Sequence, residues 1–154
     1  MNTFQTRITA MTALCLLIFF SAAVADEVKP DDIVGIWLIE EDGEAVEKVE
    51  IYRCEGKYCG KIVWLKAQEG TDVPVTDEKN KSEDLRDRPL LGLEVMRDYE
   101  FDGESTWREG EFYAYRKGKT VSPKLTLIDE NHLKIQIKIL FLKKSFEWKR
   151  VSEP

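Results

Sequence analysis

The stretch that decides the fold is "YRCEGKYCGKIVW", residues Tyr52 to Trp64. Its cysteines, Cys54 and Cys59, are separated by four residues and flanked on both sides by strand-like segments. A zinc site would need about four ligands, and the only histidine, His132, is far away in the sequence. A redox pair is typically Cys-x-x-Cys at the start of a helix. The pattern therefore favours a β-hairpin closed by a disulfide, with no metal and no cofactor.

We expect Cys54 to lie directly opposite Cys59 across the loop "EGKY". The same register places Val49 opposite Trp64, with the apolar side chains on one face. A non-hydrogen-bonded pair has Cα atoms about 4.5 Å apart, which a disulfide can span. A free or catalytic cysteine pair is the alternative, and the choice between them depends on the compartment.

The N-terminus indicates that compartment. "MNTFQTRITA" carries one positive charge, Arg7, and is followed by the apolar run "MTALCLLIFF" and the small residues "SAAVA". This order is typical of a signal peptide cleaved after Ala25, which leaves one domain, residues 26–154. A retained membrane anchor is the alternative, but the run is marginal against the roughly 20 apolar residues that a span needs. We therefore expect export to the periplasm or secretion, an oxidising space, and no stable membrane insertion after cleavage.

Composition narrows the classes of partner. The chain has 154 residues and a net charge of −6, with 23 basic and 29 acidic side chains that are well mixed along the sequence. Because phosphate binding needs clustered cations, nucleic acid is not expected as a partner. Anionic membrane surfaces are disfavoured for the same reason.

Alternating polarity dominates the rest of the chain. In "HLKIQIKI", residues 132–139, four apolar side chains share one face and the polar ones share the other, which is typical of a half-buried strand. About eight or nine such strands are predicted, with short connections between most of them: 35–41, 46–54, 59–66, 90–99, 104–108, 111–116, 121–128, 132–141 and 144–151. The predicted fold is all-β, a small antiparallel up-and-down barrel.

Both ends of this domain suggest how the barrel closes. Gly35 and Trp37 form a Gly-x-Trp strand entry, and the last strand carries Trp148 and Arg150 on one face. An inward arginine needs a partner, and we expect Arg150 to lie across the Trp37 ring in a cation–π contact. A solvated Arg150 beside an ordinary core tryptophan is the alternative. The pairing resembles that of the calycin barrels, the lipocalin-like group.

One connection, residues 66–89, is longer than the roughly 12–15 residues beyond which loops are usually functional or disordered. A single helical turn is expected within it, at residues 82–85. Four of its residues could form a polar site at the barrel mouth: Asp77, Asn80, Arg86 and Arg88. They could contact a ligand, or they could pin the loop across the mouth by pairing with one another, and local pairing is the commoner outcome.

Several motifs together resemble one family of exported bacterial proteins, Domain of Unknown Function 2147. The motifs, in order, are Gly35-x-Trp37, the Cys54/Cys59 hairpin, Asp77-x-x-Asn80, Arg86 to Gly92, and Trp148 to Arg150. The resemblance covers residues 34–151 and implies an exported, lipocalin-like β domain with no established activity. The chain departs from the family pattern at Tyr113-Ala114-Tyr115, where Tyr-Asp-Pro is common. It also departs in the last hairpin, which reads "ILFLKKSF" instead of being rich in glycine.

Three classes of function remain open. The first is a barrel that binds a small apolar or amphipathic ligand, with Trp64 and Trp107 among its contacts, although such aromatics are more often plain core. The second is a filled barrel that meets a protein partner, with Leu140 and Leu142 as an outward patch. The third, an enzyme, is disfavoured, because no serine–histidine, cysteine–histidine or metal constellation is visible.

Overall fold

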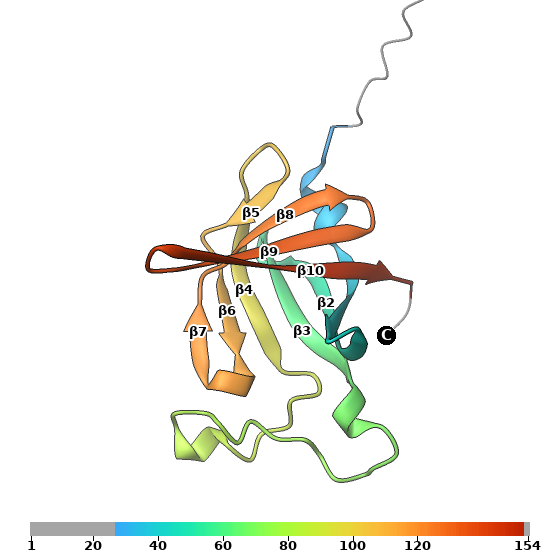
Figure 1. Cartoon of the computed structure of the whole chain (residues 1–154), viewed down its shortest axis with the longest axis vertical. Coiled ribbons are helices and arrows are strands. Elements are labelled where there is room, and N and C mark those ends of the chain that lie inside the picture. Colours follow the sequence, from blue (N-terminus) through green and yellow to red (C-terminus); the bar gives the residue numbers. More distant parts are fainter. Residues whose placement is uncertain (1–26, 153–154) are drawn as a thin grey trace, which may run out of the picture.

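The structure is a computed structural model that describes residues 27–152, drawn in Figure 1. The expected signal peptide, residues 1–25, lies outside the described residues. The described part contains four short 3-10 helices and ten strands. The helices are η1 (Pro30–Ile33), η2 (Lys66–Gln68), η3 (Glu83–Leu85) and η4 (Tyr115–Lys117). The strands are β1 (Gly35–Glu41), β2 (Glu44–Cys54), β3 (Lys57–Leu65), β4 (Glu94–Phe101), β5 (Thr106–Arg108), β6 (Glu111–Ala114), β7 (Lys119–Val121), β8 (Lys124–Asp129), β9 (His132–Ile139) and β10 (Leu142–Val151).

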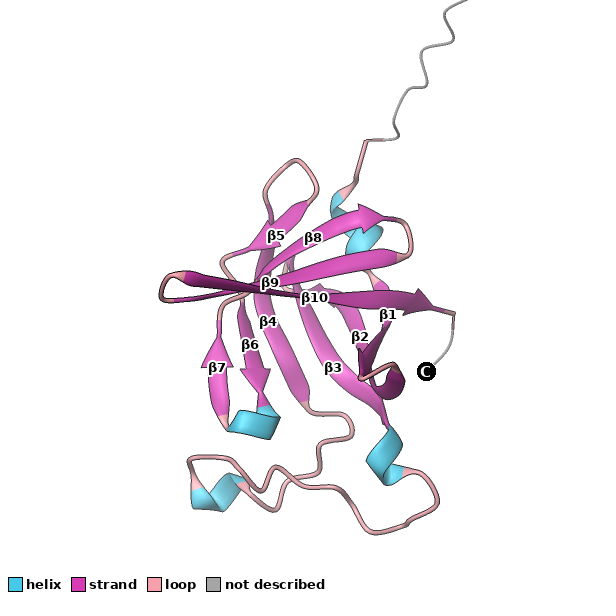
Figure 2. Cartoon of the chain, in the orientation of Figure 1, coloured by secondary structure: helices cyan, strands magenta, loops and turns pink. Residues whose placement is uncertain are grey.

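The strands form one antiparallel sheet that closes on itself. Its order is β3-β2-β1-β10-β9-β8-β5-β4, and β3 pairs with β4 to complete an eight-stranded barrel. The predicted all-β antiparallel barrel is therefore confirmed, and Figure 2 shows how little helix accompanies it. In the described part of the chain, no helix is long and apolar enough to cross a membrane.

The two extra strands, β6 and β7, extend the barrel wall on one side. Phe101 of β4 lies opposite Trp107 of β5, and Met96 lies opposite Phe112 of β6, so β5 and β6 follow the same edge of β4 in one register. They are interrupted at Gly110, where an added Cβ would come within 2.4 Å of the Tyr99 ring.

Two predicted strand boundaries are wrong for identifiable reasons. The predicted strand 121–128 is divided between β7 and β8 around Pro123, which has no N–H to donate to a ladder. The predicted strand 90–99 begins only at Glu94. The preceding residues return the long loop to the barrel, because the Leu90 amide donates to Val75 and the Gly92 amide donates to Ile62.

The cysteine hairpin and its disulfide are confirmed. The sulfurs of Cys54 and Cys59 are bonded, and their Cα atoms are 5.8 Å apart. The predicted register is wrong: Cys54 lies opposite Lys57, and Cys59 lies opposite Tyr52, so the disulfide runs diagonally between two pairs that share a face, with one pair between them.

A tighter turn explains the difference in register. Only Glu55 and Gly56 connect β2 to β3, and both have positive φ, 48° and 83°. Two-residue turns of this kind match the twist of a hairpin better than a four-residue loop. The shift of two residues keeps each side chain on its face, so Val49 remains buried. A bulge then places Trp64 opposite Lys48 instead of Val49.

The barrel interior is filled by large side chains. Tyr99, Ile51, Ile62, Met96, Leu125 and Leu133 are among those without exposed surface. Two buried tryptophans donate their indole N–H groups to helix η1, which closes one end: Trp37 to the carbonyl of Ile33 at 2.8 Å, and Trp107 to that of Pro30 at 3.2 Å. The opposite end, where the long loop and η4 lie, is the mouth.

Candidate functional site at the barrel mouth

The long loop is organised around one buried carboxylate, Asp77, which is 1% exposed. Its Oδ2 accepts hydrogen bonds from Nε and Nη2 of Arg88, at 3.0 and 2.8 Å, and from Nδ2 of Asn80, at 2.7 Å. Its Oδ1 accepts a hydrogen bond of 2.8 Å from the Tyr113 hydroxyl of β6. The arginine also lies over the Tyr113 ring, 5.5 Å from its centre. The structure therefore brings three of the four predicted loop residues together.

The fourth, Arg86, supports the same cluster from the other side. Its Nε donates 2.9 Å to the Asn80 carbonyl, and its Nη1 lies 3.4 Å from Glu83 in the expected helical turn η3. The backbone adds a bridge between Thr76 and Pro89. These contacts occupy both Asp77 oxygens within the protein, so they fasten the loop across the mouth.

A second buried acid, Glu47, lies at the same end and was not among the predicted site residues. It shares the inward parity of Val49 and Ile51 on β2 and is 4% exposed. The Tyr115 hydroxyl donates 2.9 Å to its Oε2, and Nη2 of Arg116 lies 3.6 Å from that oxygen. Its Oε1 has no hydrogen-bond partner. Burial raises the pKa of Glu47 to about 7, because the charged form loses its hydration.

Helix η4 holds these partners in place. Arg116 pairs with Glu41 at the end of β1 as well as with Glu47, and its guanidinium lies 5.4 Å from the centre of the Tyr115 ring. Burial beside Glu47 raises the pKa of the Tyr115 hydroxyl. The short β6–β7 connection thus reaches the first hairpin of the barrel. The alternation of "EAVEKVEI" contained the signal for this site, since Glu47 falls on its apolar face.

The two predicted tryptophans make their polar and ring contacts with residues other than the two acids. Trp64 is half-buried; its indole N–H donates 3.2 Å to Glu69, and the Lys48 ammonium lies 5.4 Å from its ring centre. Trp107 is fully buried in the closed half and packs against Tyr58 and Phe101. Trp64 therefore borders the long loop at the end of β3, whereas Trp107 lies at the η1 end of the barrel.

The expected contact between Trp37 and Arg150 is present at the opposite end. The guanidinium carbon lies 4.3 Å from the ring centre. Nη1 donates 2.7 Å to the Val34 carbonyl, Nε donates 2.6 Å to that of Glu130, and Nη2 donates to that of Asp32. Arg150 therefore satisfies three backbone carbonyls from two separate segments while covering the tryptophan.

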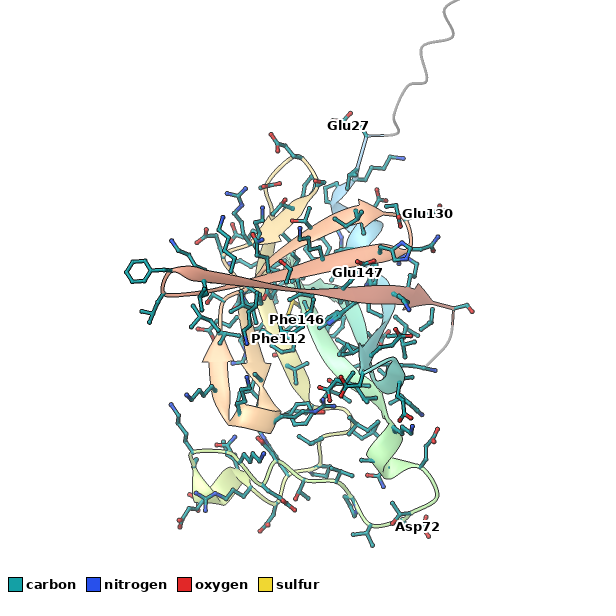
Figure 3. The ribbon with its side chains drawn as sticks, viewed as in Figure 1. Glu27, Asp72, Phe112, Glu130, Phe146 and Glu147 are labelled. Atoms are coloured by element: carbon teal, nitrogen blue, oxygen red, sulfur yellow. A yellow bond between two sulfur atoms is a disulfide. The ribbon has the colours of Figure 1, made fainter. Side chains whose placement is uncertain are left out.

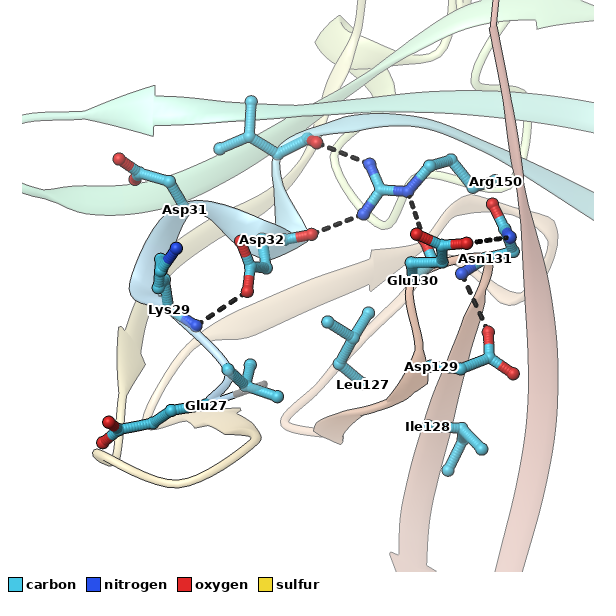
Figure 4. A pocket seen from close by; sticks show the side chains of 12 residues that line it. Glu27, Lys29, Asp31, Asp32, Leu127, Ile128, Asp129, Glu130, Asn131 and Arg150 are labelled. Carbon is cyan, nitrogen blue, oxygen red and sulfur yellow. Dashed lines mark hydrogen bonds between the residues drawn. The ribbon is translucent and has the colours of Figure 1, made fainter. Parts of the chain in front are cut away.

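An open groove of about 630 Å³ lies outside the barrel beside this arginine, as Figure 4 shows. Its polar walls come from residues 27–34 and from the β8–β9 turn, and Leu127 and Ile128 add apolar surface. The Arg150 donors that face it are already used by carbonyls. Among the residues that the structure describes, no group of three metal-ligating side chains occurs in this groove or elsewhere.

Comparisons with known proteins agree with this architecture. The model of the family described as "Uncharacterized protein conserved in bacteria (DUF2147)" matches residues 35–150. The chain belongs to the DUF2147 family. In this DUF2147 protein, the match begins at Gly35 and ends at Arg150, where the two ends meet: a Cβ on Gly35 would lie 2.5 Å from Arg150 Nη1. Among curated proteins, none matches the sequence.

A solved structure similar to this DUF2147 chain is that of protein HP1028 from Helicobacter pylori, whose title assigns it to the lipocalin family. The TM-score is 0.67 and the identity is 22%, over 78% of this chain and 83% of that one. At this identity the likeness shows the fold alone, a lipocalin-like barrel.

Proposed function

We propose that this chain is an exported protein of the bacterial envelope that binds a small amphipathic ligand at the barrel mouth. The observation that carries the proposal is Glu47, a buried acid whose Oε1 has no partner in the described protein. Buried polar groups are nearly always hydrogen-bonded, so one that is not is a candidate contact for a ligand. Export is supported by the Cys54–Cys59 disulfide, which is the kind of bond that persists in an oxidising compartment.

The mouth is a better place for a ligand than the end of the barrel near η1. Trp37, Trp107 and Tyr99 have no exposed surface and occupy the interior near η1. Around the mouth, Ile39 and Phe112 are partly buried against the core, and Leu65, which lies opposite Glu47, is buried. An eight-stranded barrel either fills with side chains or holds one small ligand, and here bulky aromatic residues fill the end near η1.

The chemistry of the mouth fits a ligand with a polar group and an apolar body. With a pKa of about 7, Glu47 can be protonated or ionised near neutral pH, so its free oxygen can meet a donor or an acceptor. The apolar surface continues from Tyr115 to Phe112, whose ring centre lies 5.9 Å from that of Trp148 on β10. Such a site combines one oriented polar contact with aromatic walls, as small-molecule sites usually do.

A fluorescence titration tests this proposal. Delipidated protein is titrated with fatty acids, fatty amines and other small amphiphiles while the emission of Trp148 and its neighbours is followed. We expect saturable binding of at least one class, weakened about tenfold or more in Glu47→Gln, because a buried hydrogen bond to a charged group is worth roughly 1.5–3 kcal/mol.

The matched control is Glu50→Gln, also on β2 but on the outer face, where Glu50 pairs with Lys61 at 3.1 Å. It should bind as the unchanged protein does. Saturable binding by no amphiphile, or equal affinities for the two variants, would contradict a ligand site at Glu47.

One observation favours a second candidate, a filled barrel that serves as an interaction protein. All the largest buried side chains, from Trp37 to Val95, fill the interior, as a purely structural domain requires. In that case Asp77 and Arg88 stabilise a loop that offers its outer surface to a protein partner. Crosslinking from the exposed Leu85 in cells distinguishes the two: a discrete partner without any ligand response supports this candidate.

A further inference from the structure

The hairpin of β9 and β10 extends beyond the barrel wall, as Figure 1 shows. β8 pairs with β9 only as far as Gln136, and β1 pairs with β10 only from Lys149 onwards. All residues from 138 to 146 are exposed. Figure 3 shows side chains projecting from this hairpin where it extends beyond the barrel. We call residues 138–144, with sequence "KILFLKK", the hairpin tip.

The tip exposes large apolar side chains in an unusual place. Leu140 and Phe141 form the turn and are 81% and 100% exposed, and the adjacent Leu142 is 68% exposed. Turns of two residues favour Asn-Gly, because one or both positions need positive φ. Here Leu140 has φ 53°, which a leucine rarely adopts. The turn therefore places apolar surface outward against the local backbone preference.

Positive charge lies directly behind this apolar apex. Ile139 pairs with Leu142 next to the turn, and the next pair is Lys138 with Lys143, followed by Lys144. In the described part of the chain, no carboxylate pairs with any of these three lysines. A chain with a net charge of −6 thus carries a local +3 at the tip of a protruding hairpin. The turn strengthens this cluster, because it brings Lys138 directly opposite Lys143.

The order of these layers matches one leaflet of a membrane. Two residues of strand span about 7 Å, so apolar groups lie at the apex and ammonium groups begin about 7 Å behind them. Interfacial segments bury their apolar face roughly 5–10 Å below the head groups, and lysines extend to reach phosphates at that level. A flat protein interface would not require this separation of apolar and basic layers by depth. We propose that the hairpin tip docks the protein peripherally on an anionic phospholipid surface.

Vesicle co-sedimentation tests the proposal with protein purified after export, its N-terminus determined. Vesicles of phosphatidylglycerol and phosphatidylcholine in equal parts are compared with vesicles of phosphatidylcholine alone. We expect the protein to bind the vesicles that contain phosphatidylglycerol, and this binding should weaken as the salt concentration rises. Binding to vesicles of phosphatidylcholine alone should be much weaker. Phe141→Ser with Leu142→Ser should lower the partition coefficient at least about tenfold. Lys138→Gln with Lys143→Gln should lower it about fivefold per lysine.

The controls change equally exposed residues elsewhere. Val73, which is 73% exposed, and Lys81 lie in the long loop, so Val73→Ser and Lys81→Gln should leave binding unchanged. The fluorescence of the tryptophan added in Phe141→Trp should be quenched by brominated lipid. The fluorescence of the tryptophan added in Val73→Trp should not. Equal binding by the tip variants and controls, or no binding to anionic vesicles, would overturn the proposal. A different outcome is that the unchanged protein forms a dimer, that the tip variants lose this dimer, and that neither binds vesicles. That result would instead assign the tip to contact between two copies of the chain.

Discussion

The hydroxyl of Tyr113 on β6 donates a hydrogen bond of 2.8 Å to the buried carboxylate of Asp77, 36 residues earlier in the chain. This bond joins the long loop to the strands added beside the barrel. Arg88 and Asn80 bind the other Asp77 oxygen, so one carboxylate connects three segments. The buried carboxylate is therefore a central attachment of the loop, in addition to the backbone bonds at its ends.

Removing that centre should loosen the loop selectively. Asp77→Ala leaves Arg88 without its partner, and we expect a loss of about 3 kcal/mol in the free energy of unfolding. Tyr113→Phe removes one hydrogen bond and should cost about 1 kcal/mol. Urea unfolding measures both, and hydrogen exchange should report faster opening in residues 66–93 than in β2. The exposed Asp87→Asn is the control, and a similar loss there would contradict a special role for Asp77.

Arg150 should stabilise the fold through the planar arrangement of its guanidinium N–H donors, and not only through its charge. It donates to three carbonyls and covers Trp37. A lysine cannot reproduce this planar geometry, so Arg150→Lys should lower the free energy of unfolding by about 2 kcal/mol. Arg97 forms an exposed ion pair with Glu94, in which the two charged atoms are 3.8 Å apart. Arg97→Lys should therefore change the free energy of unfolding by less than about 0.5 kcal/mol. If thermal unfolding shows equal effects for Arg150→Lys and Arg97→Lys, the guanidinium geometry of Arg150 contributes nothing beyond its charge.

Glu47 should make stability depend on pH in a defined direction. Its pKa is about 7 in the folded protein and 4.5 in the reference state, so the folded state holds the proton more tightly. The stabilisation by that proton is complete below about pH 4.5 and is lost as pH rises towards 7. A difference of this size corresponds to about 3 kcal/mol.

Glu47→Gln keeps the shape but cannot ionise, so its stability relative to the unchanged protein should increase between pH 4.5 and 7 and then level off. Urea unfolding at several pH values measures this difference. Glu50→Gln, on the outer face of β2, should show no such trend. Parallel stability curves for Glu47→Gln and the unchanged protein would show that Glu47 is ionised when folded.

The disulfide closes only the short β2–β3 turn, so it should contribute modestly. In the chain-entropy account, a loop of this size restricts the unfolded chain by roughly 2 kcal/mol. We expect Cys54→Ser with Cys59→Ser to remain folded, with a melting temperature lower by several degrees. Calorimetry of this variant, and of the unchanged protein with reductant, checks the value. Complete unfolding on reduction would mean that the hairpin depends on the bond.

Much of the fold could be predicted because it follows from local rules. The alternation in "HLKIQIKI" determined β9 correctly up to Ile139, and the contact of Trp37 with Arg150 was expected because an inward charge needs a partner. The predicted register of the cysteine hairpin was wrong because apolar pairs alone do not distinguish two registers that differ by two residues. The positive φ values of Glu55 and Gly56 decide it, and they depend on strand twist.

The mouth was only half predictable, for a different reason. Asp77, Asn80 and Arg88 lie in one loop, so their spacing already suggested mutual pairing. Glu47 of β2 and Tyr115 of η4 are 68 residues apart in sequence and meet only because β6 and η4 extend over the first hairpin. No local pattern indicates that long-range contact, although an acid on an apolar face was a visible anomaly.

Gly118 should be the glycine whose replacement disturbs the mouth most. It has φ 57°, and an added Cβ would lie 1.9 Å from the Lys79 carbonyl oxygen in the long loop. Gly118→Ala therefore combines a left-handed backbone with a backbone clash, and we expect a loss of more than about 2 kcal/mol with faster hydrogen exchange around Asn80. Gly103→Ala is the matched control, because Gly103 has φ 92° but nothing within 4 Å of the added Cβ, so only the backbone cost of about 1 kcal/mol applies. If the two variants lose the same stability, the close approach of η4 to the loop does not constrain the mouth.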